Sequence, residues 1–194
     1  MNPLLTTHPL ARQIQRYALL TTLVRYDRRL APTPYLASRW AWSPDSLELV
    51  FSIRRTLRWT DGVRTTARDA AFTLEMARDA ATGYPRRRDL RHVVEVRAAD
   101  DTTLVLRFDR PQSGIPDVLT DLAILPAHRF QGVRAATMRE VPWNLAPIGN
   151  GPFTFVRHEP NRRWVFEANP RFPAELGRPA IERLVVAEIG RAHV

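Results

Sequence analysis

The sequence contains no cysteine among its 194 residues, and all of its 29 basic residues are arginine, because lysine is absent as well. Without cysteine, disulfides and thiolate metal sites are excluded, and the chain suits either an oxidising or a reducing compartment. The missing lysine indicates a GC-rich coding sequence. No run of about 18 apolar residues occurs, so we expect no membrane-spanning segment.

The formal charge of +9 raises nucleic acid or an anionic membrane as partners. The arginines are scattered, however, apart from the run Arg86–Arg88, and no aromatic–basic stripe accompanies them. We interpret the charge as compositional drift on a solvated surface and expect no nucleic-acid partner. The arginine run is interpreted as a solvated loop, with an anion contact as the alternative. A nucleic-acid-binding protein would show affinity that falls steeply with salt.

Residues 36–76 carry the clearest local patterns, in a chain whose apolar content of 44% is enough for one domain with a real core. The segment 47–53 alternates apolar and polar residues, which predicts a half-buried strand. Residues 43–46 before it have turn chemistry. Residues 60–62 form a second turn, in which Gly62 can adopt a positive φ without steric cost.

Two helices are expected. Thr66 can cap a helix that starts at Ala67, with Asp69 at its third position as a short capping box. Its apolar stripe consists of Ala70, Ala71, Leu74 and Ala77, flanked by Phe72 and Met76. A second helix is predicted from Ala11 to about Val24, where apolar residues recur at helical spacing.

Two β-hairpins and one further strand follow. The strands of the first hairpin are predicted at 93–97 and 103–108, and those of the second at 153–157 and 164–167 across a turn at 159–162. The further strand is predicted at 181–186. Asp100 and Asp101 are interpreted as residues of the first hairpin turn rather than as a catalytic pair.

No pattern indicates catalysis or a bound metal or cofactor. The five histidines never fall at metal-ligand spacing, and no nucleophile triad has a local signature. Gly149-Asn150-Gly151 precedes a strand and lacks a following Gly-Lys-Ser/Thr, which argues against a phosphate loop. These glycines are expected to allow a close backbone approach. Trp59, Asp61 and Gly62 are interpreted as structural, and we expect a protein that is not an enzyme.

The pieces of residues 36–76 together resemble the signature region of the family 5 extracellular solute-binding proteins, which are the oligopeptide, dipeptide and nickel receptors of ABC importers. The matching pieces, in order and at family spacing, are Leu36–Trp40, Ser43–Asp45, Phe51–Arg54, Trp59–Gly62 and Thr66–Ala70. Ile53 and Ala70 replace the usual Leu and Val, and Thr60 stands where the family often has His. Further similar segments are Asn2-Pro3, Ile124–His128, Ile148–Phe153 and Asn169–Phe172.

The resemblance implies an α/β fold like that of the type II periplasmic binding proteins. We expect a partial first lobe with a mixed sheet, β-hairpins and flanking helices. The implied function is the substrate-binding component of an ABC importer, which captures peptides or similar solutes, works as a monomer with ABC permease subunits and needs no cofactor. The implied place is the periplasm or the outer face of the cytoplasmic membrane. The alternative is a ligand-sensing domain of a cytoplasmic transcriptional regulator.

The resemblance also suggests which residues lie nearest the ligand cleft. They are Thr7, His8 and Pro9 in the first loop and Tyr84 in a later one. Thr7 would offer a hydroxyl and Tyr84 an aromatic wall, and ordinary loop residues are the alternative. In the family, most residues that grip the ligand's termini fall outside a segment of this length, so the ligand's identity is left open.

Residues 1–187 are expected to form an incomplete lobe of a longer receptor, because Met1–Leu5 lacks the features of a secretory signal. Residues 188–194, EIGRAHV, match a translated adapter sequence and are expected to be a non-native tail. An incomplete lobe would have unpaired sheet edges and low stability. A sharp, cooperative thermal transition of residues 1–187 would count against that expectation.

Overall fold

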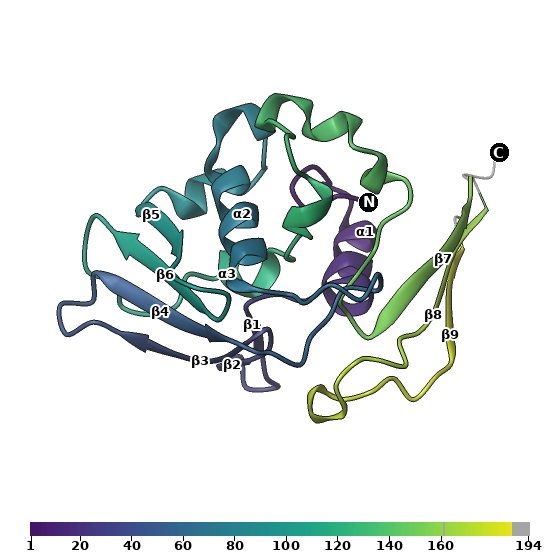
Figure 1. Ribbon diagram of the computed structural model, residues 1–194, viewed down its shortest axis with the longest axis horizontal. Coiled ribbons are helices and arrows are strands. Elements are labelled where there is room, and N and C mark those ends of the chain that lie inside the picture. Colours follow the sequence, from purple (N-terminus) through teal and green to yellow (C-terminus); the bar gives the residue numbers. More distant parts are fainter. Residues whose placement is uncertain (161, 188–194) are drawn as a thin grey trace.

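The computed structural model describes residues 1–160 and 162–187 (Figure 1). The expected tail at 188–194 and one residue of the expected turn at 159–162 lie outside the described residues. The helices and longer turns are α1 (Pro9–Ile14), the π-helical turn η1 (Gln15–Leu19), α2 (Ala67–Arg78), η2 (Ala80–Thr82), η3 (Arg87–Leu90), α3 (Val118–Asp121), η4 (Ala127–Arg129), η5 (Ala135–Glu140), η6 (Pro142–Asn144) and η7 (Ala174–Leu176). The strands are β1 (Val24–Tyr26), β2 (Pro32–Pro34), β3 (Ala37–Trp42), β4 (Glu48–Ile53), β5 (Val93–Ala98), β6 (Thr103–Phe108), β7 (Phe153–Glu159), β8 (Arg163–Ala168) and β9 (Arg183–Ala187).

The described strands form three sheets, with the orders β1-β2, β3-β4-β6-β5 and β7-β8-β9. Every pairing is antiparallel. The mixed sheet that we expected is therefore wrong for the described part of the chain, because the hairpin turns and also the long link from β4 through α2 and β5 to β6 bring each strand back in the opposite direction. The α/β class, both hairpins and the flanking helices are confirmed. Figure 1 shows the four-stranded and three-stranded sheets on opposite sides of α1.

The four-stranded sheet carries the main core. Along β4, Leu49, Phe51 and Ile53 are buried and alternate with more exposed residues, as the sequence predicted. Helix α2 packs across β5 and β6, with Leu74 and its small alanines buried against them (Figure 1). None of the described helices is long and apolar enough to cross a membrane.

The predicted capping box at the start of α2 is present. The carboxylate of Asp69 accepts a hydrogen bond from the backbone N–H of Thr66 at 2.8 Å. The same carboxylate, which is almost fully buried, also accepts from the backbone N–H of Ala127 at 2.8 Å and from Trp59 Nε1 at 3.4 Å. Asp69 therefore joins the helix to the turn that begins η4 and to a fully buried indole.

The first helix is shorter than the sequence predicted. Helical turns run from Pro9 to Leu19, and Leu20 is already extended, with φ −127° and ψ 169°. Leu23, which we assigned to the helix, is buried in the segment between η1 and β1. The periodicity thus identified buried positions correctly, but it did not locate the helix end.

The chain leaves the helix at Leu19 because a second backbone segment lies against that point. The N–H of Gly151 donates to the carbonyl of Leu19 at 2.9 Å, and the fully buried Asn150 accepts from the N–H of Thr21 at 2.9 Å. A Cβ on Gly149 would lie 2.0 Å from the Leu19 carbonyl oxygen. The expected close backbone approach at these glycines is confirmed, and it joins the N-terminal helix to the start of β7.

Candidate functional site

A cavity of about 240 Å³ lies where the N-terminal loop, the helical segment 9–19, the loop after η2 and helix α3 meet. Its lining combines apolar side chains with hydroxyl, amide and charged groups. The lining residues are Pro3, Thr6, Thr7, Arg12, Gln15, Tyr84, Pro85, Arg86, Asp121, Leu122 and Ala123. Four segments that are distant in the sequence therefore meet at one concave site, which is the usual form of a small-molecule site.

The fold brings together two of the four residues that the sequence analysis selected. Thr7 and Tyr84 line this same cavity, with Thr7 exposed and Tyr84 buried except for 7% of its surface. His8 instead lines an apolar groove between α1 and β9. Pro9 is the first residue of α1, where its missing N–H costs nothing, and it lines a neighbouring cleft beside Arg12.

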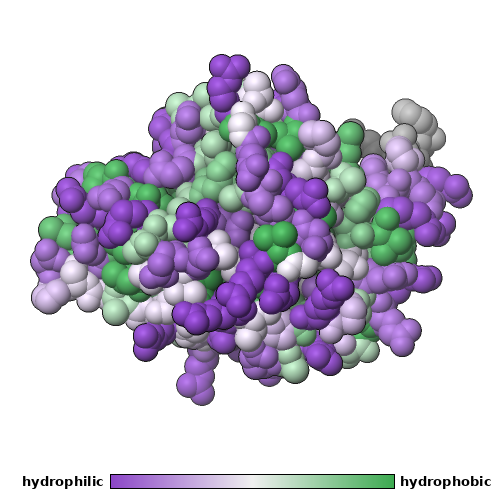
Figure 2. All heavy atoms as spheres, in the orientation of Figure 1, coloured by the Kyte–Doolittle hydropathy of each residue, from purple (hydrophilic) through white to green (hydrophobic). Residues whose placement is uncertain are grey.

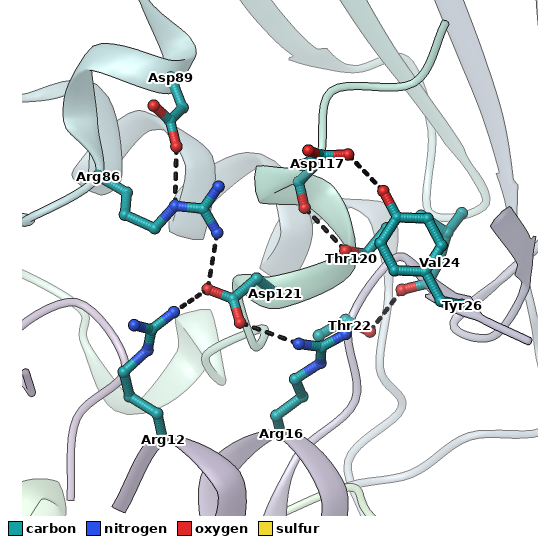
Figure 3. Close-up of polar contacts among 10 residues, drawn as sticks. All are labelled: Arg12, Arg16, Thr22, Val24, Tyr26, Arg86, Asp89, Asp117, Thr120 and Asp121. Carbon is teal, nitrogen blue, oxygen red and sulfur yellow. Dashed lines mark hydrogen bonds and ion pairs between the residues drawn. The ribbon is translucent and has the colours of Figure 1, made fainter. Parts of the chain in front are cut away.

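One carboxylate organises the charged wall of the cavity (Figure 3). Asp121, at the end of α3, accepts hydrogen bonds from Arg12, from Arg16 at 3.0 Å and from Arg86 at 2.9 Å. Arg86 also donates to Asp89 at 2.7 Å. Arg12 and Arg16 are four residues apart and project from the same side of the N-terminal helical segment toward α3 (Figure 3). We call these five side chains the Asp121 cluster.

The expectation that Arg86–Arg88 is simply a solvated loop is wrong for its first residue. Arg86 is half-buried, because it reaches across to α3 and closes one side of the cavity, whereas Arg87 and Arg88 are exposed in η3. Its ion pairs hold the pKa of Arg86 above the ordinary value even though burial acts in the opposite direction.

The environment shifts the pKa of two other groups at this site. Burial raises the pKa of Asp121, but hydrogen bonds from Arg86 and Arg12 outweigh burial and hold the value below the ordinary one. Burial also raises the pKa of the Tyr84 phenol well above its usual value. At neutral pH the site therefore presents a charged carboxylate, three guanidinium groups and an uncharged phenol.

We expect Asp121→Asn to lower the free energy of unfolding by about 1–2 kcal/mol at pH 7, since three guanidinium groups would then face one another without their shared carboxylate. The folded-state pKa of Asp121 is depressed, so its contribution is complete above about pH 4 and disappears as the pH falls through the folded pKa. Urea denaturation of both proteins should show a difference that shrinks steadily as the pH is lowered below about 4.

Asp101→Asn is the matched control, because that carboxylate is 60% exposed and forms a single ion pair with Arg68. Its loss should cost less than about 0.5 kcal/mol. Equal losses for the two variants, or a loss at Asp121 that does not diminish as the pH falls, would contradict the electrostatic description of the Asp121 cluster.

Arg12, Gln15 and Asp121 belong to the site, although no pattern in the sequence indicated them. The spacing of Arg12 and Arg16 placed both on one helical face, but nothing local connected that face to residue 121. The fold also has a larger, more open groove of about 970 Å³ on another side of Arg16, bordered by Tyr26, Arg54 and Leu176. Neither Thr7 nor Tyr84 lines that groove.

The sequence matches a known family and several of its curated members. Residues 31–193 match the model of the bacterial extracellular solute-binding proteins, family 5. A protein of Brucella ovis named as an ABC transporter peptide-binding protein is 31% identical over 165 residues, which are 84% of this chain and 31% of the relative. The chain thus spans about a third of the length of the curated relatives that it matches.

Solved structures show the same architecture. The oligopeptide-binding protein AppA of Bacillus subtilis, in complex with a nonapeptide, superposes with a TM-score of 0.89 at 24% identity, over 97% of this chain and 37% of that one. OppA of Haemophilus influenzae, in complex with the peptide RPPGFSPFR, gives a TM-score of 0.80 at 25% identity, over 94% and 38%. The expected type II binding-protein fold is confirmed, and the chain belongs to the family 5 bacterial extracellular solute-binding proteins.

Proposed function

We propose that this chain is part of a receptor that captures peptides or similar solutes for an ABC importer. The family assignment supports this proposal most directly, together with relatives and structural neighbours that are named for peptide binding. The family consists of binding proteins, so the receptor would perform no covalent chemistry on its ligand. The comparisons lend no support to the alternative of a sensor domain in a transcriptional regulator.

We place the contribution of this chain to ligand binding at the cavity that holds Thr7 and Tyr84. Thr7 has an exposed hydroxyl that can hydrogen-bond the ligand's main chain, and the Tyr84 ring offers an apolar wall. The cavity is too small for a whole peptide, so the rest of the ligand would contact other parts of the receptor. Closure of two lobes around the ligand would be the change that the permease recognises.

The finer parts of the proposal follow from the family. The receptor would work as a monomer in the periplasm or at the outer face of the cytoplasmic membrane, where it would dock on the permease subunits. On the face of the chain in Figure 2, hydrophilic side chains are spread from end to end, and hydrophobic ones lie between them in separate groups. Such a surface suits a protein that meets its permease transiently.

Calorimetric titration of the complete receptor, meaning this chain with the remainder of its family fold, tests the proposal with peptides of two to nine residues. We expect saturable binding, and we expect Thr7→Val to weaken it about threefold to tenfold, because the isosteric change removes one hydrogen-bonding hydroxyl. Thr137→Val is the matched control, since Thr137 does not line the cavity and its hydroxyl donates to the nearby carbonyl of Arg134. A receptor that binds none of these peptides would overturn the proposal.

A further inference from the structure

We propose that the cavity beside Tyr84 binds a carboxylate, so that the receptor favours acidic solutes, in particular peptides with an Asp or Glu side chain. This inference rests on the proposed function, because it names the ligand chemistry of the same cavity. It is carried by the charge of the Asp121 cluster, by hydrogen-bond donors that lack partners, and by the size of the cavity.

The charge of the Asp121 cluster is not balanced. Arg12, Arg16 and Arg86 carry three positive charges, and Asp121 and Asp89 carry two negative ones. The carboxylate side chain of Asp121 is only 15% exposed, and the three arginine side chains are 20–43% exposed. Water therefore screens the remaining positive charge only partly. One more carboxylate would make the cluster neutral, whereas a cationic group would add repulsion.

The guanidinium groups of the cluster also have N–H donors that its own hydrogen bonds do not use. A guanidinium group has five N–H donors, and the hydrogen bonds of the cluster use one from Arg12, one from Arg16 and two from Arg86. Arg12 and Arg86 both line the cavity, so they can hold a carboxylate between them as paired N–H donors. The donors are thus placed at the wall where an anion would sit.

A buried amide beside these arginines gives independent support. Gln15 is 98% buried and lines the cavity, and its Nε2 has no hydrogen-bond partner among the described residues. The neighbouring Nε of Arg16 is likewise buried without a partner there. Folded proteins rarely leave buried N–H donors unpaired. Two such donors on consecutive residues mark this part of the helical segment as one that suits an acceptor-rich group.

The cavity's dimensions restrict what can carry the carboxylate. Its volume of about 240 Å³ is below the roughly 300–1,000 Å³ that is typical of pockets for whole drug-sized ligands. A single acidic side chain, or the last residue of a peptide, is the appropriate size. The Tyr84 ring with Pro3 and Pro85 provides the apolar wall for its methylene groups.

The first test uses the complete receptor and needs no peptide. Glutarate and its uncharged diamide are titrated at low ionic strength while the arginine Nε–H resonances are followed by NMR. We expect glutarate, but not the diamide, to shift the Arg12 and Arg86 resonances saturably. In Arg12→Gln, where only the Arg86 resonance is left to report binding, glutarate should no longer shift that resonance. Arg107→Gln should leave both shifts unchanged, because Arg107 is 58% exposed on β6 and lies outside the cavity. Equal responses to both compounds would overturn the inference.

The second test uses the complete receptor and peptides that differ in one group. Ala-Glu-Ala should bind about tenfold more tightly than Ala-Gln-Ala, and Arg12→Gln should reduce that ratio to about twofold or less while Arg107→Gln preserves it. The same comparison between a free C-terminus and a C-terminal amide shows whether the last residue is the source of the carboxylate. Peptide binding with no preference for either carboxylate would overturn this inference and leave the proposed function intact. A receptor that binds glutarate but none of the peptides would overturn the proposed function and leave the carboxylate site intact.

Discussion

Replacing Gly149 with alanine should destabilise the fold by about 3 kcal/mol or more. The new Cβ would lie 2.0 Å from the carbonyl oxygen of Leu19 and 2.8 Å from its Cδ1. Main-chain atoms cannot move aside without breaking the adjoining hydrogen bonds, so the clash must open the contact between the helical segment and the start of β7. Urea denaturation followed by circular dichroism would measure the loss.

Gly114→Ala is the control for the general effect of removing a glycine. A Cβ at Gly114 would meet nothing within 4 Å, and Gly114 is not among the glycines with a positive φ. We expect a change of less than about 1 kcal/mol, in either direction. If Gly149→Ala were as harmless as Gly114→Ala, the backbone contact that ends the first helix at Leu19 would be wrong.

Replacing Asp69 with alanine is the second change with a large expected effect. The substitution would leave four donors without their acceptor, namely the N–H groups of Thr66 and Ala127, the hydroxyl of Thr66 and the indole N–H of Trp59. Because Asp69 is 4% exposed and Trp59 is fully buried, water cannot easily replace the carboxylate. We expect a loss of about 3–4 kcal/mol in the free energy of unfolding, with about half of that loss for Asp69→Asn.

Asp45→Ala provides the comparison. Asp45 also accepts a backbone hydrogen bond, from the N–H of Leu47 at 3.1 Å, but it lies in an exposed turn. We expect a much smaller loss than for Asp69→Ala, since water can satisfy the freed donor. Similar losses for Asp45→Ala and Asp69→Ala would show that Asp69 acts only as a helix cap and does not join α2 to the η4 turn.

Asp69 also shows how far the sequence alone could lead. The spacing of Thr66 and Asp69 predicted the capping box, because that interaction is local. The bonds from Ala127 and Trp59 depend on where distant segments meet, so no spacing indicates them. Alternation likewise predicted the bounds of β4 and of the strands in both hairpins to within two residues, since successive residues of a half-buried strand face the core and the solvent in turn.

The end of the first helix could not be predicted in this way. Its apolar residues continue at helical spacing to Leu23, yet the helix stops at Leu19 because Gly149 and Gly151, which lie 130 and 132 positions further along, occupy the adjoining space. Most residues of the candidate site could not be predicted from local sequence either. Family resemblance led to Thr7 and Tyr84, but Asp121 draws its partners from two other segments of the chain and has no local signature.

The central claim is that this chain contributes to solute binding through the cavity that Thr7 and Tyr84 line. Hydrogen–deuterium exchange of the complete receptor, with and without a saturating peptide, tests it most directly. We predict slower exchange at residues 6–16 and 83–87 when the peptide is bound. The claim would be contradicted if exchange slowed only at residues 25–28 and 175–177 of the larger groove. It would also be contradicted if the peptide slowed exchange elsewhere in the receptor but nowhere in this chain.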